Sequence, residues 1–426
     1  MNGLSREMPP ESLAARATVH AAAKHFVRIV AALAVVFFLV KADIYLFVTG
    51  LLPVAPSTLF FLLSLPLIYC TAIRSLHEGR LPPAVHGSMR VLLPFTVLVA
   101  FSLVGILVRY PHIPEDMRPL FFPFLNLYVF FIGILLGGIR IERSVWKAAL
   151  VAGLLVTIVT IAIDVFLPHT FTLQELEGPS GLAQNPNGGA YIALLLMVCA
   201  VDWERPSLGL KNLLVIGLAF FGIFLTASRS GILAAAVVGL VYFLRVSSSV
   251  RLARKIKVAA VCALLLALIV SAFAYVVESG PASESEPSKV SRLLSMDAEI
   301  LRFGDIASLE RVDAVDRSLR IIEEKTALGM GTGYVYSMPV GPHNMYLARW
   351  VDNGLVGLLS YLWLLLAAFL VNRKNRNAEG MAIALVFFFF GLFSHNVLED
   401  RTILLLLAMS TARGAVSINE SGPSSP

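Results

Sequence analysis

The chain has 426 residues, of which 57% are hydrophobic and 15% are charged, and its mean hydropathy is +0.79. Soluble domains are about 45–50% apolar and about 25% charged, so the composition excludes a soluble globular protein and indicates a polytopic membrane protein. The net charge of +6 comes mostly from the loops between apolar runs, and it gives no reason to expect a nucleic-acid partner.

Apolar runs long enough to cross about 30 Å of hydrocarbon as helices recur along the whole chain. They predict an all-α fold with about 12 transmembrane helices. A cytoplasmic tail is expected at 1–26, helices one to nine at 27–277, a long outer loop at 278–346, helices ten to twelve at 347–415, and a second tail at 416–426. The predicted spans are 27–48, 57–73, 91–109, 119–138, 148–167, 187–201, 211–227, 231–246, 258–277, 347–371, 380–397 and 402–415.

The distribution of Lys and Arg over the short loops predicts the orientation. Sixteen of them fall in the loops on one side, against four on the other side (Arg109, Arg118, Arg229 and Arg401). Cytoplasmic loops carry the excess of positive charge, so both termini are predicted inside and residues 278–346 outside.

The outer loop is far longer than ordinary connections, which usually signals function. Within it, "DIASLERVDAVDRSLRIIEEKTALG" places apolar residues at helical spacing, which predicts an amphipathic helix on the membrane face that stops at Gly329. The predicted apolar face consists of Ile306, Leu309, Val312, Val315, Leu319 and Ile322. The following "GMGTGY" predicts a tight turn; as a dinucleotide motif it is weak, because it follows a helix on the outer side.

Two arginines on the outer side are candidate anion ligands. Arg229 in "LTASRSGIL" lies in a very short hairpin between two apolar runs. It is either an interfacial arginine whose side chain reaches water or a clamp for a phosphate, which suits the planar guanidinium. Arg311 flanks the predicted apolar face of the loop helix, and a solvated ion pair with Glu310 or Asp313 is the alternative there.

The pair His343-Asn344 precedes the tenth predicted span and is the candidate for proton transfer. Imidazole titrates near neutral pH and can act as a base, whereas a structural histidine capping the helix is the alternative. His395 repeats the His-Asn pair and is a second polar contact or a decoy. Lys41 and Asp43, in the outer part of the first span, are weaker candidates. "NPNGG" at 185–189 predicts a helix start. No metal-ligand motif is present, so no metal site is expected.

The ordered set "TASRSG", "SLERVDAVDRSL…ALGMGTGY" and "PHNMYLARWVDNGLVG" closely resembles the O-antigen ligase and polymerase superfamily. The resemblance covers roughly residues 180–400. It implies transfer of a glycan from undecaprenyl diphosphate to an acceptor on the periplasmic face of the bacterial inner membrane, with no nucleotide, metal or other cofactor. The family's catalytic residues map onto Arg229, Arg311 and His343, with Asn344 orienting substrate or loop.

Among the activities of this superfamily, an O-antigen ligase that acts on a lipid A–core sugar is the preferred interpretation. A polymerase with a second lipid-linked repeat unit as its acceptor is the closest alternative, and a protein-glycosylating ligase is a third. A flippase for lipid-linked glycans is the alternative from another class. A flippase needs cations through several spans but no base, whereas the cations here cluster at the outer face.

Overall fold

The computed structural model of the protein describes residues 25–26, 28–109, 118–139, 141–173, 178–207, 209–247 and 306–420. Across these ranges the chain forms α-helices and short 3₁₀ helices, with no strand. The expected all-α membrane class is therefore confirmed. The predicted span 258–277 and residues 278–305 of the outer loop lie outside the described ranges.

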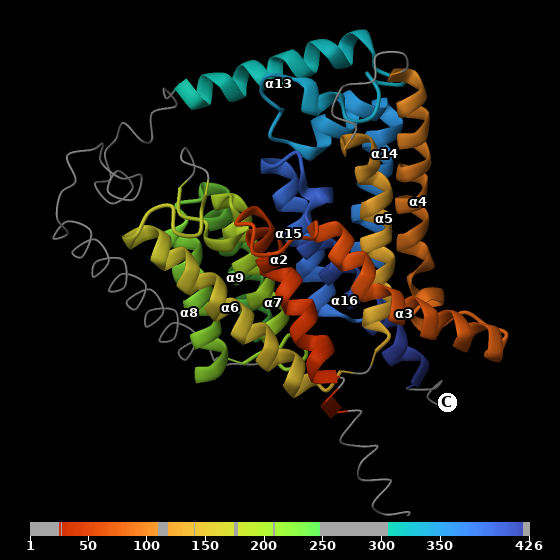
Figure 1. The fold of residues 1–426 in the computed structure, drawn as a ribbon, viewed down its shortest axis with the longest axis vertical. Coiled ribbons are helices and arrows are strands. Elements are labelled where there is room, and N and C mark those ends of the chain that lie inside the picture. The colour runs from red at the N-terminus through yellow and green to blue at the C-terminus, as the bar shows by residue number, and fades with distance from the viewer. Residues whose placement is uncertain are drawn as a thin grey trace, which may run out of the picture.

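Most of the main helices stand side by side, whereas α3 runs obliquely away from the bundle (Figure 1). Their bounds are α3 Pro56–Glu78, α4 Pro83–Arg109, α5 Arg118–Gly137, α6 Arg143–Phe166, α7 Pro186–Ala200, α8 Leu210–Leu225, α9 Arg229–Ser247, α14 Met345–Lys374, α15 Ala378–Phe393 and α16 Arg401–Glu420. Three 3₁₀ turns lie in the connections: η1 Gly181–Ala183, η2 Tyr334–Ser337 and η3 Val397–Glu399.

Within the described residues, six helices are long and apolar enough to cross a membrane: α3, α4, α5, α6, α9 and α14. A bent pair, Arg28–Leu39 with α2 (Ala42–Val48), makes a seventh if it counts as one span. The apolar helices α7, α8 and α15 have 15, 16 and 16 residues. At about 1.5 Å per residue they are shorter than about 30 Å of hydrocarbon, so the count of twelve spans stays a prediction.

Several helices are bent within the predicted spans or extend beyond them. The span predicted at 27–48 bends by 60° between Leu39 and Ala42. Lys41, at this break, has a left-handed φ of 59°. Helix α4 begins at Pro83 rather than 91, and α16 continues to Glu420 rather than ending at 415. Hydropathy marks the part of a helix that lies in hydrocarbon, whereas the helix itself continues through adjoining polar residues.

Helix α13 (Ile306–Glu324) lies across one end of the bundle, and both described chain ends lie toward the opposite end (Figure 1). The predicted amphipathic helix is thus present, but its buried face differs. Ala314, Ser318 and Ile322 are buried, whereas Val312 and Leu319 are 56% and 43% exposed. The exposure of Val312 and Leu319 is compatible with the predicted position on the membrane face, whereas the small residues Ala314 and Ser318 allow α13 to approach the bundle closely.

Helix α7 occupies the centre of the bundle and fixes the position of its own first turn. Every residue from Gly188 to Ala200 is buried. Asn185 accepts hydrogen bonds from the backbone N–H groups of Asn187 (2.9 Å) and Gly188 (3.2 Å), and Pro186 occupies the first helical position. This is an ordinary N-terminal cap, so the helix start predicted from "NPNGG" is confirmed.

Candidate functional site

A polar cavity of about 830 Å³ lies at the end of the bundle beneath α13. Distant segments of the chain line it: the break at Lys41, the start of α7, the α8–α9 hairpin, Val315 of α13, the start of α14, and the connection from α15 to α16. Three of the predicted site residues, Arg229, His343 and Asn344, line this one cavity. Arg229 and His343 are 114 positions apart in the sequence.

His343 directly precedes α14 and has a left-handed φ of 47°, which is uncommon for a residue with a Cβ. The cap of α14 is Asn344, whose Oδ1 accepts hydrogen bonds from Tyr346 N (2.9 Å) and Leu347 N (3.1 Å). The alternative in which His343 caps this helix is therefore wrong. The Asn344 Nδ2 also donates to the carbonyl of Leu392, at 3.4 Å. Asn344 thus holds the helix start against the end of α15.

Arg229 is the first residue of α9, and its side chain is exposed. The turn before it is fixed by local contacts: Ala227 has a φ of 53°, and Thr226 Oγ1 accepts a hydrogen bond from Ser228 N at 3.2 Å. The Ser228 hydroxyl accepts from Gly231 N at 3.1 Å and thereby caps α9. The short hairpin thus holds Arg229 at the rim of the cavity.

The α8–α9 hairpin is tied to the start of α7 through one amide. The Ser228 and Ser230 hydroxyls donate to Asn187 Oδ1, at 2.6 Å and 3.2 Å. A Cβ added at Gly231 would lie 2.4 Å from the Cβ of Ala190, so only glycine permits this approach of α9 to α7. The two serines that flank Arg229 in the sequence therefore serve to position the arginine. Asn187 was not singled out from the sequence, because its contact is made across 41 residues.

Arg311 lies in the first part of α13, and the structure describes its position but not its side chain. Position 311 precedes the buried residues Ala314 and Ser318 by three and seven residues, a spacing that places all three on one helix face. It also precedes the cavity-lining Val315 by one turn. The predicted site residue Arg311 is therefore on the side of α13 that faces the bundle, rather than at the flank of that face.

Two ion pairs connect the break in the first span to the start of α16. Lys41 Nζ lies 2.7 Å from Asp400 Oδ2, and Arg401 Nη2 lies 2.7 Å from Asp43 Oδ2. Lys41 and Asp400 line the cavity, and Asp43 is fully buried. Charges removed from water in this way are stable only when paired, so these contacts fix the geometry of the cavity floor. Lys41 and Asp43 are candidates from the sequence alone, but their partners lie more than 350 residues away, where no local sequence pattern reveals them.

The glycine-rich "GMGTGY" forms the expected tight turn, and it wraps around a break in α14. Gly329, Gly331 and Gly333 have φ values of 69°, 99° and 76°. The Asp352 carboxylate accepts hydrogen bonds from Gly333 N (3.1 Å) and Val335 N (3.0 Å). Asp352 is fully buried and precedes the non-helical residues at 353–354. This clamp, which the sequence analysis missed, attaches the outer loop to α14 and so holds His343 in place.

His395 lies in the same cavity, with its ring centroid 5.5 Å from that of His343. Its ring packs against Gly341, where an added Cβ would lie 2.9 Å from His395 Cε1. Burial, together with the neighbouring His343 and Arg349, lowers the pKa of His395 to about 4. His395 is therefore neutral at physiological pH.

Behind His395, Tyr336 of η2 donates a hydrogen bond to Glu399 of η3. The ring of Tyr336 lies 5.9 Å from that of His395. Burial raises the pKa of Glu399 to about 7, although the Tyr336 hydroxyl and Arg349 act in the opposite direction. The carboxyl group of Glu399, which precedes the cavity-lining Asp400 in the sequence, therefore changes charge near neutral pH.

The helices and the cavity define a multi-pass membrane protein with a polar, cation-bearing cavity at one end of its bundle. Residues 214–362, from α8 into α14, match the family described as O-antigen ligase. This match confirms the resemblance to the O-antigen ligase and polymerase superfamily of bacterial membrane proteins. A comparison with curated proteins found no match.

Proposed function

We propose that the protein is an O-antigen ligase, which transfers a glycan from undecaprenyl diphosphate to a lipid A–core sugar on the periplasmic side of the inner membrane. The observation that carries the proposal is the convergence of Arg229, His343 and the α13 face bearing Arg311 on one cavity. The family match supports the superfamily. The choice of the ligase within it is part of the proposal.

In this reaction the two arginines would hold the donor diphosphate. A diphosphate leaves with negative charge, and a guanidinium stabilises that charge with two parallel hydrogen bonds while staying protonated. Arg229 stands at the cavity rim on a fixed hairpin, and position 311 lies on α13 one turn before the cavity-lining Val315. Fixed donors aimed at developing charge contribute strongly to catalysis because they need no reorganisation.

His343 would act as the base. As the acceptor hydroxyl oxygen forms its bond to the anomeric carbon, the bond from that carbon to the diphosphate oxygen breaks, and the hydroxyl proton moves to the imidazole. This direct displacement inverts the anomeric centre. A covalent intermediate would need a free carboxylate. The cavity-lining Asp400 is engaged by Lys41 at 2.7 Å, so it is a poor candidate for that role.

A polymerase of the same superfamily remains the second candidate, because the matched family region does not distinguish the acceptor. A flippase for lipid-linked glycans is disfavoured by the location of the cavity. The cavity lies at one end of the bundle, and its described cations, Lys41 and Arg229, are both at that end. Transport across the membrane would require polar groups along the whole path.

The lipopolysaccharide gel profile of a deletion strain separates the ligase from the polymerase. Loss of a ligase leaves lipid A–core without any O-chain, whereas loss of a polymerase leaves core that carries a single repeat. Complementation with the wild-type gene should restore the ladder, and complementation with His343→Ala should not. A single-repeat band in the deletion strain would show that the protein is a polymerase instead of a ligase.

A further inference from the structure

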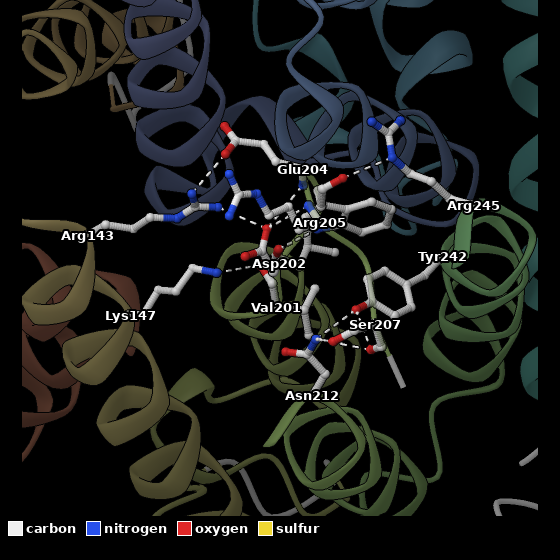
Figure 2. A network of polar contacts seen from close by, with 12 residues as sticks. Arg143, Lys147, Val201, Asp202, Glu204, Arg205, Ser207, Asn212, Tyr242 and Arg245 are labelled. Atoms are coloured by element: carbon white, nitrogen blue, oxygen red, sulfur yellow. Dashed lines mark hydrogen bonds and ion pairs between the residues drawn. The ribbon is translucent and has the colours of Figure 1, made fainter. Parts of the chain in front are cut away.

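A second polar cavity, of about 410 Å³, lies at the opposite end of the bundle from His343. It is formed by the first turn of α6, the connection from α7 to α8, and the first turn of α8. Figure 2 shows the side chains that converge there. Four cations line it, Arg143, Lys147, Arg205 and Lys211, together with a single carboxylate, Asp202. Glycan transfer as proposed above uses none of these residues.

Two of the four cations are held by contacts within the protein. Arg143 donates to Glu204 Oε2 at 2.8 Å and to Asp202 Oδ1 at 3.0 Å. Lys147 Nζ donates to the carbonyl of Val201 at 3.1 Å. Figure 2 shows these contacts as dashed lines between α6 and the α7–α8 connection. They build the wall of the cavity and fix the connection that carries Arg205.

The other two cations, Arg205 and Lys211, have exposed side chains with no ion-pair partner among the described residues. Burial disfavours the charged form of Asp202, but the backbone N–H of Arg205 and the cations Lys147 and Arg143 outweigh it and lower the pKa of Asp202. Asp202 is therefore ionised at neutral pH. The carboxylates Asp202, Glu204 and Glu379 act on Arg143 and Lys147, so Arg205 and Lys211 are the cations best placed to take a bound anion.

The surface next to the cavity is apolar. Leu210 and Leu214, on the first turns of α8, are 74% and 56% exposed, and a Cβ added at Gly217 would meet nothing within 4 Å. Positions 210, 214 and 217 lie on one helix face. We call these three positions the apolar stripe of α8. Lys211, which lines the cavity, lies next to the first residue of this stripe, so the cations are close to a surface suited to acyl chains. A soluble phosphate would use the cations but would leave the stripe without a role.

We propose that this cavity binds the phosphate of an acidic phospholipid in the inner leaflet, with Arg205 and Lys211 as the principal ligands and the acyl chains along α8. Ser207 and Asn212 line the cavity as neutral polar neighbours of the headgroup. Asn212 Nδ2 also donates to the Tyr242 hydroxyl at 3.0 Å, which ties α8 to α9. A bound lipid therefore contacts a region that connects α6, α7, α8 and α9. This inference does not depend on the proposed glycan transfer.

The test is lipid titration of the purified full chain followed by native mass spectrometry, with phosphatidylglycerol compared with phosphatidylcholine. Each basic residue near an anionic surface contributes about a fivefold gain in affinity, so Arg205→Gln with Lys211→Gln should weaken phosphatidylglycerol binding by roughly 25-fold. Phosphatidylcholine binding should not change. The matched control is Arg373→Gln with Lys374→Gln, two exposed cations at the end of α14 that do not line the cavity.

Three outcomes would overturn the proposal: equal binding of the two lipids, an equal loss in the control variant, or displacement of the lipid by soluble glycerol phosphate at millimolar concentration. The last outcome would identify a free-phosphate site instead. If the double variant does not fold, the wild-type protein tests the proposal by itself. Phosphatidylglycerol should raise its thermal unfolding temperature more than phosphatidylcholine does, and the single variant Lys211→Gln should reduce that difference.

Discussion

At the scale of single residues, His343 carries the chemistry of the proposed reaction. It combines an uncommon backbone conformation, a φ of 47°, with a position in the wall of the cavity that Arg229 also lines. Left-handed conformations of residues other than glycine persist where the surroundings impose them, and functional sites are enriched in them. Here Asn344 caps α14 immediately after it, and the Asp352 clamp holds the loop before it.

We predict that His343→Ala loses about 10²–10⁴-fold in transfer rate while retaining donor binding, because a general base contributes about this much. The wild-type rate should fall on the acid side of neutral pH, where imidazole becomes protonated. Transfer of labelled glycan in proteoliposomes across pH 5–8 measures both effects. His395→Ala is the control and should be much milder. A flat wild-type profile, or full activity of His343→Gln, would leave His343 as a positioning residue only.

Arg229 and Arg311 should each resist replacement by Lys, because an ammonium group does not reproduce the planar fork of a guanidinium. Losing one such donor costs about 2–4 kcal/mol of transition-state stabilisation, or about 10²–10³-fold in rate. Arg317→Lys, an exposed residue on α13, is the matched control and should be silent. Near-normal transfer by folded Arg229→Lys and Arg311→Lys proteins would exclude the proposed role of these arginines as a diphosphate clamp.

The raised pKa of Glu399 predicts that the stability of the folded protein depends on pH. Its pKa rises from 4.5 to about 7 in the folded protein, so its protonated form is favoured there, and stability is lost as pH increases from about 4.5 to 7. His395, with its pKa lowered to about 4, acts in the opposite sense and adds stability between about pH 4 and 6.5. The two contributions therefore offset each other in the wild-type protein.

Replacing Glu399 with Gln keeps an acceptor for Tyr336 but removes the titration. Relative to the wild type, Glu399→Gln should gain stability as pH rises from about 4.5 to 7, by at most about 3 kcal/mol. Thermal unfolding in detergent at several pH values gives this difference directly, and the His395 contribution cancels in it. Parallel curves for the two proteins would show that Glu399 does not titrate in this range.

At the scale of secondary structure, the break in α14 connects the outer loop to the bundle. Gly354 has a φ of 64°, and a Cβ there would lie 2.0 Å from the carbonyl oxygen of Ala327. Leu355 N donates to the Thr326 carbonyl at 2.9 Å, so the backbone after the break is bonded to the chain that follows α13. The arrangement leaves no room for any side chain at position 354.

We therefore predict that Gly354→Ala destabilises the protein strongly, because it combines an unfavourable φ with a backbone clash. Gly217→Ala is the control on α8, where nothing lies within 4 Å, and it should be neutral or slightly stabilising since Ala favours helix. Thermal unfolding of detergent-purified protein compares the two. Equal unfolding temperatures for Gly354→Ala and the wild type would contradict the tight packing of the turn.

At the scale of the whole molecule, the two polar cavities lie at opposite ends of one helical bundle. The cavity with Arg229 and His343 is beneath α13, and the cavity with Arg205 and Lys211 is at the other end. The first helical segment of the described chain and the end of α16 also lie away from α13 (Figure 1). This arrangement agrees with the excess of Lys and Arg in the predicted cytoplasmic loops.

Cysteine labelling tests the predicted topology. In intact cells from which Cys70, Cys199 and Cys262 have been removed, Leu328→Cys should react with a membrane-impermeant thiol reagent from the periplasm. Leu328 is 55% exposed and lies just after α13. Arg80→Cys, between α3 and α4, is the control and should react only after the inner membrane is permeabilised. The opposite pattern would invert the orientation and place His343 in the cytoplasm.

The sequence by itself determined the membrane class, most helix positions, the tight turn at "GMGTGY" and the superfamily. These features depend on local properties, namely runs of apolar residues, glycine at positions of positive φ, and short motifs. The helix start at "NPNGG" was predictable for the same reason, since its cap bonds span only two or three residues.

Only the tertiary structure decided which residues surround the cavity. Lys41 meets Asp400 across 359 positions and Asn187 meets Ser228 across 41, and no periodic pattern encodes such pairings. It also decided which face of α13 is buried, because close packing selected Ala314 and Ser318 over the larger Val312 and Leu319. Hydrophobicity reports the free energy of leaving water, whereas the packed face depends on the shape of the surface that each helix meets.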